Sequence, residues 1–259
     1  MASTIEQGLL TVRSRIERAA RAAGRDPASI QLIAVSKTFP ASAVVEALHL
    51  GQDAFGENHA QEAVDKIAAV RDLLQRSAIS GANPELRNAV ATTDGSAAVP
   101  SRTPIPQWHF IGPIQSNKTR LLAEHFDWVQ SVDRLKVAQR LSDQRARVAP
   151  ALQICIQVNI SGEASKSGVE PAAALSLAQQ VCVLPGLRLR GLMAIPEPTT
   201  DVQAQRRQFR RLRELLDELI AQGLHLDTLS IGMSDDFEAA IAEGATMVRV
   251  GRAIFGERE

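Results

Sequence analysis

The sequence has no excess of charge of either sign and no long apolar run. Its 259 residues carry 29 basic and 29 acidic side chains, so the formal net charge is zero. Such a chain has no global field that attracts nucleic acid or an anionic membrane, and any anion must be bound by local donors. It lacks a stretch of about 18 apolar residues and the basic and apolar segments of a signal peptide. We therefore expect a protein that is neither membrane-spanning nor secreted.

Cysteine is scarce, and histidine is scattered. Cys155 lies in an apolar, strand-like run and Cys182 in a helical segment, where thiols serve as small buried hydrophobic groups. Two such residues do not form the disulfide framework of a secreted domain, so we expect a reducing, cytoplasmic location. The five histidines lack metal-ligand spacing, and we predict no metal site.

Strand-like and helical segments alternate along the whole chain. The first helix carries Ile5, Leu9, Val12 and Ile16 on one face. Strands are predicted at 32–35, 53–55, 108–111, 128–131, 152–160, 187–193, 228–231 and 247–250. Further helices are predicted at 43–50, 61–74, 118–124, 135–145, 172–183, 202–222 and 236–243. Eight such units in about 250 residues indicate the α/β class, as a (β/α)8 TIM barrel forming one domain over 1–259. A doubly wound open sheet is the alternative.

Residues 79–106 interrupt this alternation. The segment is rich in Ser, Ala, Asn, Thr and Pro and shows neither helical nor strand periodicity. This composition predicts a long flexible surface loop. We expect the loop to carry no chemistry.

Lys37 is the most informative single residue. It follows the apolar run Leu32 to Val35, where an ammonium group is costly to desolvate. A lysine at such a position favours attack on a carbonyl, so we consider a Schiff base on Lys37. The alternative is a lysine whose aliphatic part packs along the strand while its ammonium group reaches water.

Closure of the barrel would bring the last strand beside the first, and its residues close to Lys37. Arg249 then has the parity of an inward-facing residue, although a structural salt bridge would explain it equally well. Gly251 precedes a short helical stretch at 253–255, where the backbone amides favour an anion. Ser234, after the seventh strand, could cap the next helix or donate its hydroxyl to a phosphate. TIM barrels commonly bind phosphate between these two loops.

These residues predict a carbonyl compound whose phosphate lies one strand away from its carbonyl carbon. Pyridoxal phosphate fits, and so does a sugar phosphate held by a Schiff-base aldolase. Arg249 beside a pyridine nitrogen would disfavour protonation of that nitrogen, since a second cation there is repelled. The ring would then be a weak electron sink.

The chain closely resembles the single-domain pyridoxal phosphate homeostasis proteins, which are related to the N-terminal barrel of alanine racemase. The resemblance covers nearly the whole chain through AVSKT, FGENHAQE, HFIGPIQSNK, VNISGEASKSG, RGLMAIP, GMSDDFEAAI and VRVGRAIFG. It implies pyridoxal 5'-phosphate as the cofactor, bound to Lys37, with its phosphate at Ser234 and Gly251 and its ring nitrogen near Arg249. The residues expected to line the pocket are Asn58, Asn159, Met193 and Met233.

Three further residues of these motifs have open interpretations. His109 and Asn117 match the pattern, but a strand-end histidine and a helix-capping asparagine would have the same appearance. Arg252 stands where relatives usually have Thr or Ser, so a hydroxyl contact to phosphate is lost. Its backbone amide could still serve, and its guanidinium could replace the hydroxyl.

The sequence contains no tyrosine. The resemblance supplies a tyrosine as the second base of a racemase, which needs one base on each face of the substrate carbon; a histidine or cysteine could in principle substitute. The chain also stops at Glu259, without the extra β domain of a racemase dimer. We therefore expect a monomeric, non-catalytic protein that holds pyridoxal phosphate and, as the resemblance implies, passes it to apo-enzymes. The alternatives are an amino-acid racemase and a Schiff-base aldolase; a structural scaffold with a vestigial pocket is a third possibility.

Overall fold

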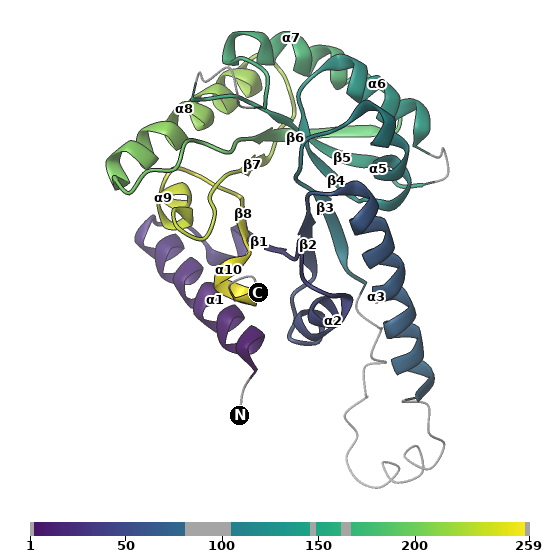
Figure 1. The fold of residues 1–259 in the computed structure, drawn as a ribbon. Coiled ribbons are helices and arrows are strands. Elements are labelled where there is room, and N and C mark those ends of the chain that lie inside the picture. Colours follow the sequence, from purple (N-terminus) through teal and green to yellow (C-terminus); the bar gives the residue numbers. More distant parts are fainter. Residues whose placement is uncertain (1–2, 81–104, 146–148, 162–166, 257–259) are drawn as a thin grey trace, which may run out of the picture.

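The computed structural model describes residues 3–80, 105–145, 149–161 and 167–256. Its strands form a closed parallel barrel in the order β1 to β8, so the expected TIM barrel is confirmed and the open sheet is not. Figure 1 shows the helices surrounding this barrel, with α1 lying beside α10 and α9. The strands are β1 Gln31–Val35, β2 Ala54–Glu57, β3 Gln107–Phe110, β4 Trp128–Val132, β5 Leu152–Gln157, β6 Leu187–Met193, β7 Thr228–Ser230 and β8 Met247–Val250.

Helices follow the strands and cover the outside of the barrel. Their bounds are α1 Thr4–Ala22, α2 Ala41–His49, α3 Ala60–Ser80, α5 Thr119–His125, α6 Leu135–Gln144, α7 Pro171–Val181, α8 Val202–Ala221, α9 Phe237–Ala242 and α10 Arg252–Phe255. Short 3-10 turns are present at η1 Pro27–Ser29 and η2 Ser116–Lys118. No helix among the described residues is long and apolar enough to cross a membrane.

Local sequence explains where the first helix begins. The Ser3 hydroxyl accepts a hydrogen bond from the backbone N–H of Glu6 at 3.1 Å, which satisfies one of the unpaired donors of α1. The apolar residues Leu9, Val12 and Ile16 are buried, as their helical spacing predicts. The α1 helix therefore presents its apolar face to its neighbours α2, α9 and α10 and its charged face to water.

Alternation along the strands separates two apolar regions. Ile33 belongs to a small cluster of six buried residues from six different strands; the others are Ala54, Trp128, Cys155, Met193 and Met247. Its neighbour Ala34 belongs instead to the large cluster that joins the strands to the helices. Successive side chains of a strand point to opposite faces, so the small cluster is the interior of the barrel.

Two predicted boundaries and one predicted burial are wrong. The α3 helix continues to Ser80 instead of ending at Leu74, and so it includes the first two residues of the predicted 79–106 loop; residues 81–104 lie outside the described part. The β5 strand ends at Gln157 rather than Ile160, because Val158 forms only an isolated bridge with Val169. Cys182 follows α7 as an exposed residue and is not buried, unlike Cys155.

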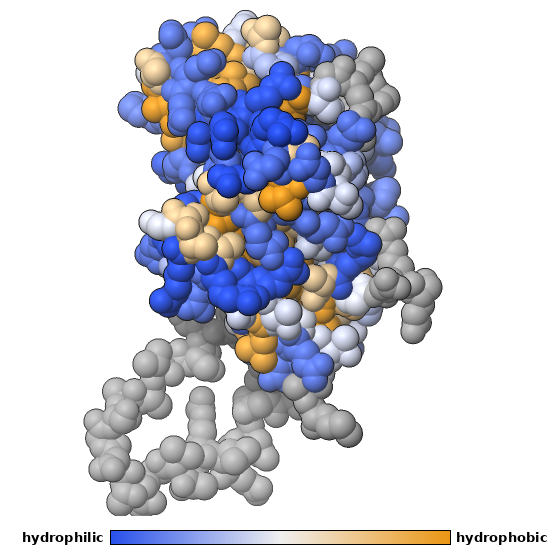
Figure 2. Space-filling view, turned by 90° about the vertical axis from the view of Figure 1, so that its left-hand side faces the viewer, coloured by the Kyte–Doolittle hydropathy of each residue, from blue (hydrophilic) through white to orange (hydrophobic). Residues whose placement is uncertain are grey.

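The face that carries α1, α8 and α9 is largely hydrophilic, with hydrophobic side chains in small separate groups (Figure 2). The α8 helix buries Phe209, Leu212, Leu216 and Leu219 against the barrel, as predicted. Its arginines do not all face water, however. Three of them converge on the buried carboxylate of Glu243, the residue that ends α9.

Candidate functional site

Lys37 lies in a tight turn immediately after β1. Thr38 has φ 71°, a left-handed conformation that residues other than glycine rarely adopt, and the N–H of Phe39 donates to the carbonyl oxygen of Ser36 at 3.0 Å. Ser36 is fully buried, whereas Lys37 is partly exposed. The turn therefore ends the strand and directs the chain to α2 while leaving Lys37 at the carboxyl end of the barrel.

A buried ion pair supports this turn. Nζ of Lys66, on α3, donates to the carbonyl oxygen of Ser36 and to Oε1 of Glu57, both at 2.7 Å. The Ser36 hydroxyl donates to the same Glu57 oxygen at 2.7 Å. The side chains of Glu57 and Lys66 are 2% and 11% exposed. Ser36, the residue directly before Lys37, is thus held by two charged side chains, Glu57 of β2 and Lys66 of α3.

The last strand lies beside the first, as predicted. Ile33 pairs with Arg249, and Ala34 pairs with Val250. One residue further on, a Cβ added to Gly251 would lie 3.2 Å from the carbonyl oxygen of Val35. Gly251 therefore lies against the end of β1, two residues before Lys37, and its lack of a side chain permits this close approach.

Arg249 is buried, at 3% exposure, and it donates to neutral oxygens. Its Nη1 donates to the carbonyl oxygen and the hydroxyl of Ser230 at 2.7 and 2.8 Å, and its Nη2 donates to the carbonyl oxygen of Ala194 at 2.9 Å. Burial lowers the pKa of Arg249 to about 10, and the Asp236 carboxylate acts in the opposite direction. The guanidinium remains charged at neutral pH. Because its acceptors are uncharged, the salt-bridge interpretation of Arg249 is not the one that the structure shows.

Ser234 lies in the loop after β7, and the structure excludes one of its two interpretations, that of a helix cap. The α9 helix begins after Asp236, so Ser234 does not cap it. The loop is closed instead by the N–H of Met233, which donates to Oδ1 of Asp236 at 2.6 Å, and by Gly232 with φ 92°. Arg15 donates to the Ser234 carbonyl oxygen at 3.4 Å. Capping therefore does not account for the Ser234 hydroxyl.

Arg252 joins the loops after β7 and β8. It begins α10 directly after Gly251, and its Nη2 forms an ion pair with Oδ2 of Asp235 at 2.7 Å. Both side chains are well exposed, at 64% and 80%. The guanidinium of Arg252 thus has an acidic partner at the surface of this end of the barrel.

The other predicted site residues follow further strands. Asn58 follows β2, and its Oδ1 is buried without a hydrogen-bond partner among the described residues. Met193 ends β6 as a fully buried member of the interior cluster. Asn159 follows β5, is 5% exposed, and accepts a hydrogen bond from the Ser161 hydroxyl at 3.0 Å. Asn117 is exposed in η2 and does not cap α5, whose N-cap is Lys118.

Sequence reasoning missed Ser36, Glu57 and Lys66. Glu57 is part of the motif FGENHAQE. An acidic residue at the end of an otherwise apolar strand is the signal that could have identified it as a site residue. His109 was considered only as a strand-end residue or as a match to a motif. The structure buries it completely inside the barrel, where its ring stacks on Trp128 at a centroid distance of 5.3 Å.

A mainly apolar cavity lies elsewhere. Its volume is about 540 Å³, and it is lined by Leu74 of α3, by Phe126 directly after α5 and by Trp108 of β3, among others. None of the predicted site residues contributes to it. No group of three or more potential metal ligands gathers anywhere among the described residues.

The geometry defines a class of protein: a TIM barrel with a lysine after β1 and an arginine in the adjacent β8. The alanine racemase N-terminal domain model matches residues 9–259. Two solved structures are each 36% identical to this chain. One is of an unknown protein from Bifidobacterium adolescentis, with a TM-score of 0.80 over 97% of this chain and 94% of that one. The other is PipY of Synechococcus elongatus with PLP bound, with a TM-score of 0.72 over 93% of this chain and 100% of that one. An alanine racemase of Clostridium difficile, 14% identical with a TM-score of 0.63 over 97% of this chain and 57% of that one, shares the fold.

Curated relatives narrow the class to one group. The pyridoxal phosphate homeostasis protein of Pseudomonas aeruginosa is 55% identical over 99% of this chain and 97% of its own length. The protein of the same name from Escherichia coli K12 is 48% identical over 98% and 97%. The chain therefore belongs to the pyridoxal phosphate homeostasis protein family, as the sequence motifs indicated.

Proposed function

We propose that this protein acts in pyridoxal phosphate homeostasis by holding pyridoxal 5'-phosphate as a Schiff base on Lys37. The observation that carries the proposal is the contact between the ends of β1 and β8. A Cβ added to Gly251 would lie 3.2 Å from the carbonyl oxygen of Val35. Lys37, two residues after Val35, and the backbone turn proposed to hold the phosphate therefore follow adjacent strands. Relatives named for this function, and PipY with PLP bound, support the same assignment.

The residues present fit this cofactor. Asn58 offers a buried side-chain oxygen that lacks a partner among the described residues. Arg249 uses three of its five N–H groups on Ser230 and Ala194, and a permanently charged guanidinium suits an unprotonated ring nitrogen. The Ser234 hydroxyl and the amides after Gly251 are the donors proposed for the phosphate. Met193, Asn159 and Met233 are proposed to line the remainder of the pocket.

Arg252 has a different proposed role from a direct phosphate ligand. Its ion pair with Asp235 ties together the two loops that carry Ser234 and Gly251. We propose that its backbone amide contributes to the phosphate site while its guanidinium holds the loops in place. The exposed pair has a small energetic value in water, so its main effect is on loop position.

The bound cofactor supplies an electrophilic imine, but the chain lacks the groups for turnover. The sequence contains no tyrosine to serve as a second base, and burial lowers the pKa of His109 to about 3, which makes it a poor base. We therefore propose a non-catalytic, monomeric, cytoplasmic carrier that transfers the cofactor to apo-enzymes. Transfer is measured as recovery of activity when the loaded protein is mixed with an apo-enzyme that requires pyridoxal phosphate.

The binding experiment uses borohydride reduction and peptide mass mapping after incubation with pyridoxal phosphate. The adduct is expected on Lys37, and Lys37→Ala is expected to lose both the adduct and the visible absorbance. Lys136→Ala, which removes an exposed lysine of α6, is the matched control and should label normally. An adduct at another lysine would refute the assignment. Racemisation of L-alanine by the loaded protein, detected by chiral analysis, would refute the non-catalytic role.

A further inference from the structure

A chain of polar side chains crosses the inside of the barrel and ends at Arg249. Nη1 of Arg249 donates to Ser230 Oγ at 2.8 Å, and this hydroxyl donates to Gln130 Oε1 at 2.6 Å. Gln130 Nε2 lies 2.9 Å from His109 Nδ1, and His109 Nε2 lies 2.9 Å from Gln107 Oε1. The five residues come from β8, β7, β4 and β3. All but Gln107 are at most 3% exposed.

The direction of every hydrogen bond in this chain follows from Arg249. A guanidinium only donates, so the Ser230 oxygen accepts and its proton is directed to Gln130 Oε1. The amide nitrogen of Gln130 then faces His109 and donates to Nδ1, which leaves the proton of the neutral ring on Nε2 for Gln107. Gln107 Oε1 also accepts from Gln31 Nε2 at 3.0 Å, so an acceptor at this point satisfies both neighbours.

This one-way chain stabilises a buried cation. Each dipole has its negative end toward Arg249, and hydrogen bonds aligned in this way strengthen one another. The hydrogen-bond acceptors of Arg249 are neutral oxygens, so no carboxylate partner balances its charge directly. The aligned dipoles of the hydrogen-bond chain take over this stabilisation. The titratable groups that act on Arg249 are Asp236, before α9, and Cys155 of β5. Burial lowers the pKa of His109 to about 3, so its ring is neutral at physiological pH and Nδ1 can accept.

We infer that Ser230, Gln130 and His109 are positioning residues that fix the guanidinium of Arg249 and its charge at the ring-nitrogen side of the pocket. The inference rests on the proposed function for the identity of the ligand, but the chain itself exists without the ligand. Cutting it at Gln130 should leave the Ser230 hydroxyl, an acceptor for Arg249, without the hydrogen bond that fixes its orientation. Ser230 would then retain its contact to Arg249 while its proton loses its acceptor.

The first test uses the cofactor-free protein and is independent of pyridoxal phosphate binding. Nitrogen-15 NMR of labelled histidine should show His109 as the neutral tautomer protonated at Nε2, with Nδ1 as an acceptor. The slowly exchanging guanidinium protons of Arg249 should exchange about tenfold faster in Gln130→Met. A tenfold change in rate corresponds to the free energy of about one buried hydrogen bond. A His109 ring protonated at Nδ1, or unchanged Arg249 exchange, would overturn the inference.

The second test asks whether the chain acts on the cofactor. Gln130→Met and Ser230→Ala should bind pyridoxal phosphate roughly threefold to tenfold more weakly and should shift the pH midpoint of the imine absorbance. Gln205→Met, which removes another buried glutamine with a single hydrogen bond to Thr199, is the matched control. If Gln130→Met and Ser230→Ala both match this control in affinity and pH midpoint, the hydrogen-bond chain is only structural. If wild-type protein binds no pyridoxal phosphate, the proposed function fails, and the Arg249 exchange rates still decide the positioning role.

Discussion

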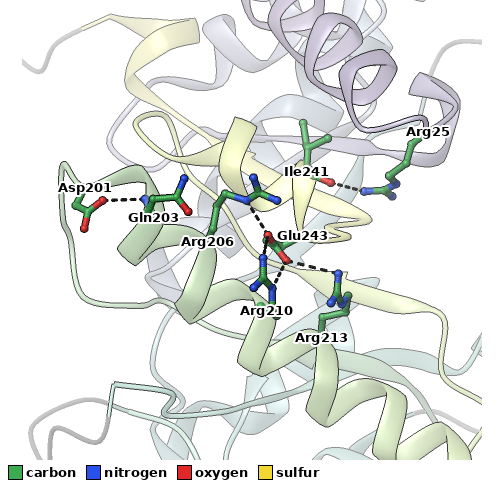
Figure 3. Close-up of polar contacts among 8 residues, drawn as sticks. All are labelled: Arg25, Asp201, Gln203, Arg206, Arg210, Arg213, Ile241 and Glu243. Carbon is green, nitrogen blue, oxygen red and sulfur yellow. Dashed lines mark hydrogen bonds and ion pairs between the residues drawn. The ribbon is translucent and has the colours of Figure 1, made fainter.

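Replacing Glu243 with glutamine tests the electrostatic connection between α8 and α9. The Glu243 side chain is 1% exposed and accepts hydrogen bonds from Nε of Arg206 at 2.7 Å and from Nε and Nη2 of Arg210 at 3.1 and 3.0 Å. Arg213 adds an ion pair at 3.5 Å. Figure 3 shows the three arginines, all from α8, directed toward this one carboxylate. Glutamine has nearly the same volume but no charge, and its amide nitrogen would face guanidinium donors.

The expected loss of stability follows from these contacts. A hydrogen bond to a charged group contributes about 1 kcal/mol more than a neutral one, so three such bonds give about 3 kcal/mol. The side chains of Arg206, Arg210 and Arg213 are 38%, 46% and 39% exposed, and solvent screening reduces this value. We expect a decrease of about 2 kcal/mol in the free energy of unfolding and of roughly 4–8 °C in Tm.

The effect of Glu243→Gln should depend on pH. Burial alone raises the pKa of Glu243, but the hydrogen bonds from Arg210 and Arg206 outweigh it and leave the pKa below its ordinary value of 4.5. A carboxyl group with a lowered folded-state pKa stabilises the fold above its unfolded-state pKa, and the stabilisation is lost as the pH falls through the folded-state value. The difference between wild type and Glu243→Gln should therefore be largest at neutral pH and shrink below about pH 4.5.

Urea unfolding followed by circular dichroism at pH 7 and at pH 4 measures both quantities. The control is Glu218→Gln, which removes an exposed acidic charge from α8, the helix that carries the three arginines, and should change stability by less than about 0.5 kcal/mol. A Glu243→Gln protein as stable as this control at pH 7 would show that the arginine cluster contributes nothing net. A pH-independent difference would show that packing, not charge, is responsible.

Three further outcomes follow from single contacts. Lys66→Met should lower the free energy of unfolding by about 3 kcal/mol in urea titrations, because it leaves the Glu57 carboxylate buried without its cation; an unchanged midpoint would refute this. Burial raises the pKa of the Cys155 thiol to about 12, so iodoacetamide should modify the exposed Cys182 first, and mass mapping that finds the reverse order would contradict the structure. Gly191→Ala should abolish soluble expression, since its Cβ would lie 1.8 Å from the carbonyl oxygen of the residue opposite on β7; a soluble protein of unchanged Tm would exclude this contact.

The order of elements could be predicted because each unit carries its own local signal. The bounds 187–193 and 247–250 match β6 and β8, since each strand begins and ends with an apolar residue. The error at β5 has a different origin. Residues 158–160 are as apolar as the strand before them, but beyond Gln157 the β pairing is reduced to the isolated bridge between Val158 and Val169. An apolar run indicates burial, and a strand also requires a neighbour in register.

The candidate site was predictable where it depended on topology. Barrel closure alone brings the end of β8 to Lys37, and the pairing of Ile33 with Arg249 follows from it. Ser36, Glu57 and Lys66 were not predictable, because their contact depends on how α3 is rotated against β2. Helical periodicity predicts which face of α3 is buried. It does not predict that Lys66, in particular, extends its side chain to the turn at Ser36.

The interior chain shows how far parity can carry a prediction and where it stops. Alternation assigns Arg249 to the inner face of β8, and the same rule applied to β3, β4 and β7 assigns His109, Gln130 and Ser230 to that interior. Each residue alone has an ordinary structural explanation. Their meaning appears only when shear and register bring four strands to one level, where the donor-only chemistry of the guanidinium orients every other group. Arg249 is a buried cation without a direct carboxylate acceptor, and such a cation requires other polar groups around it. This requirement is the signal for a polar path across the barrel.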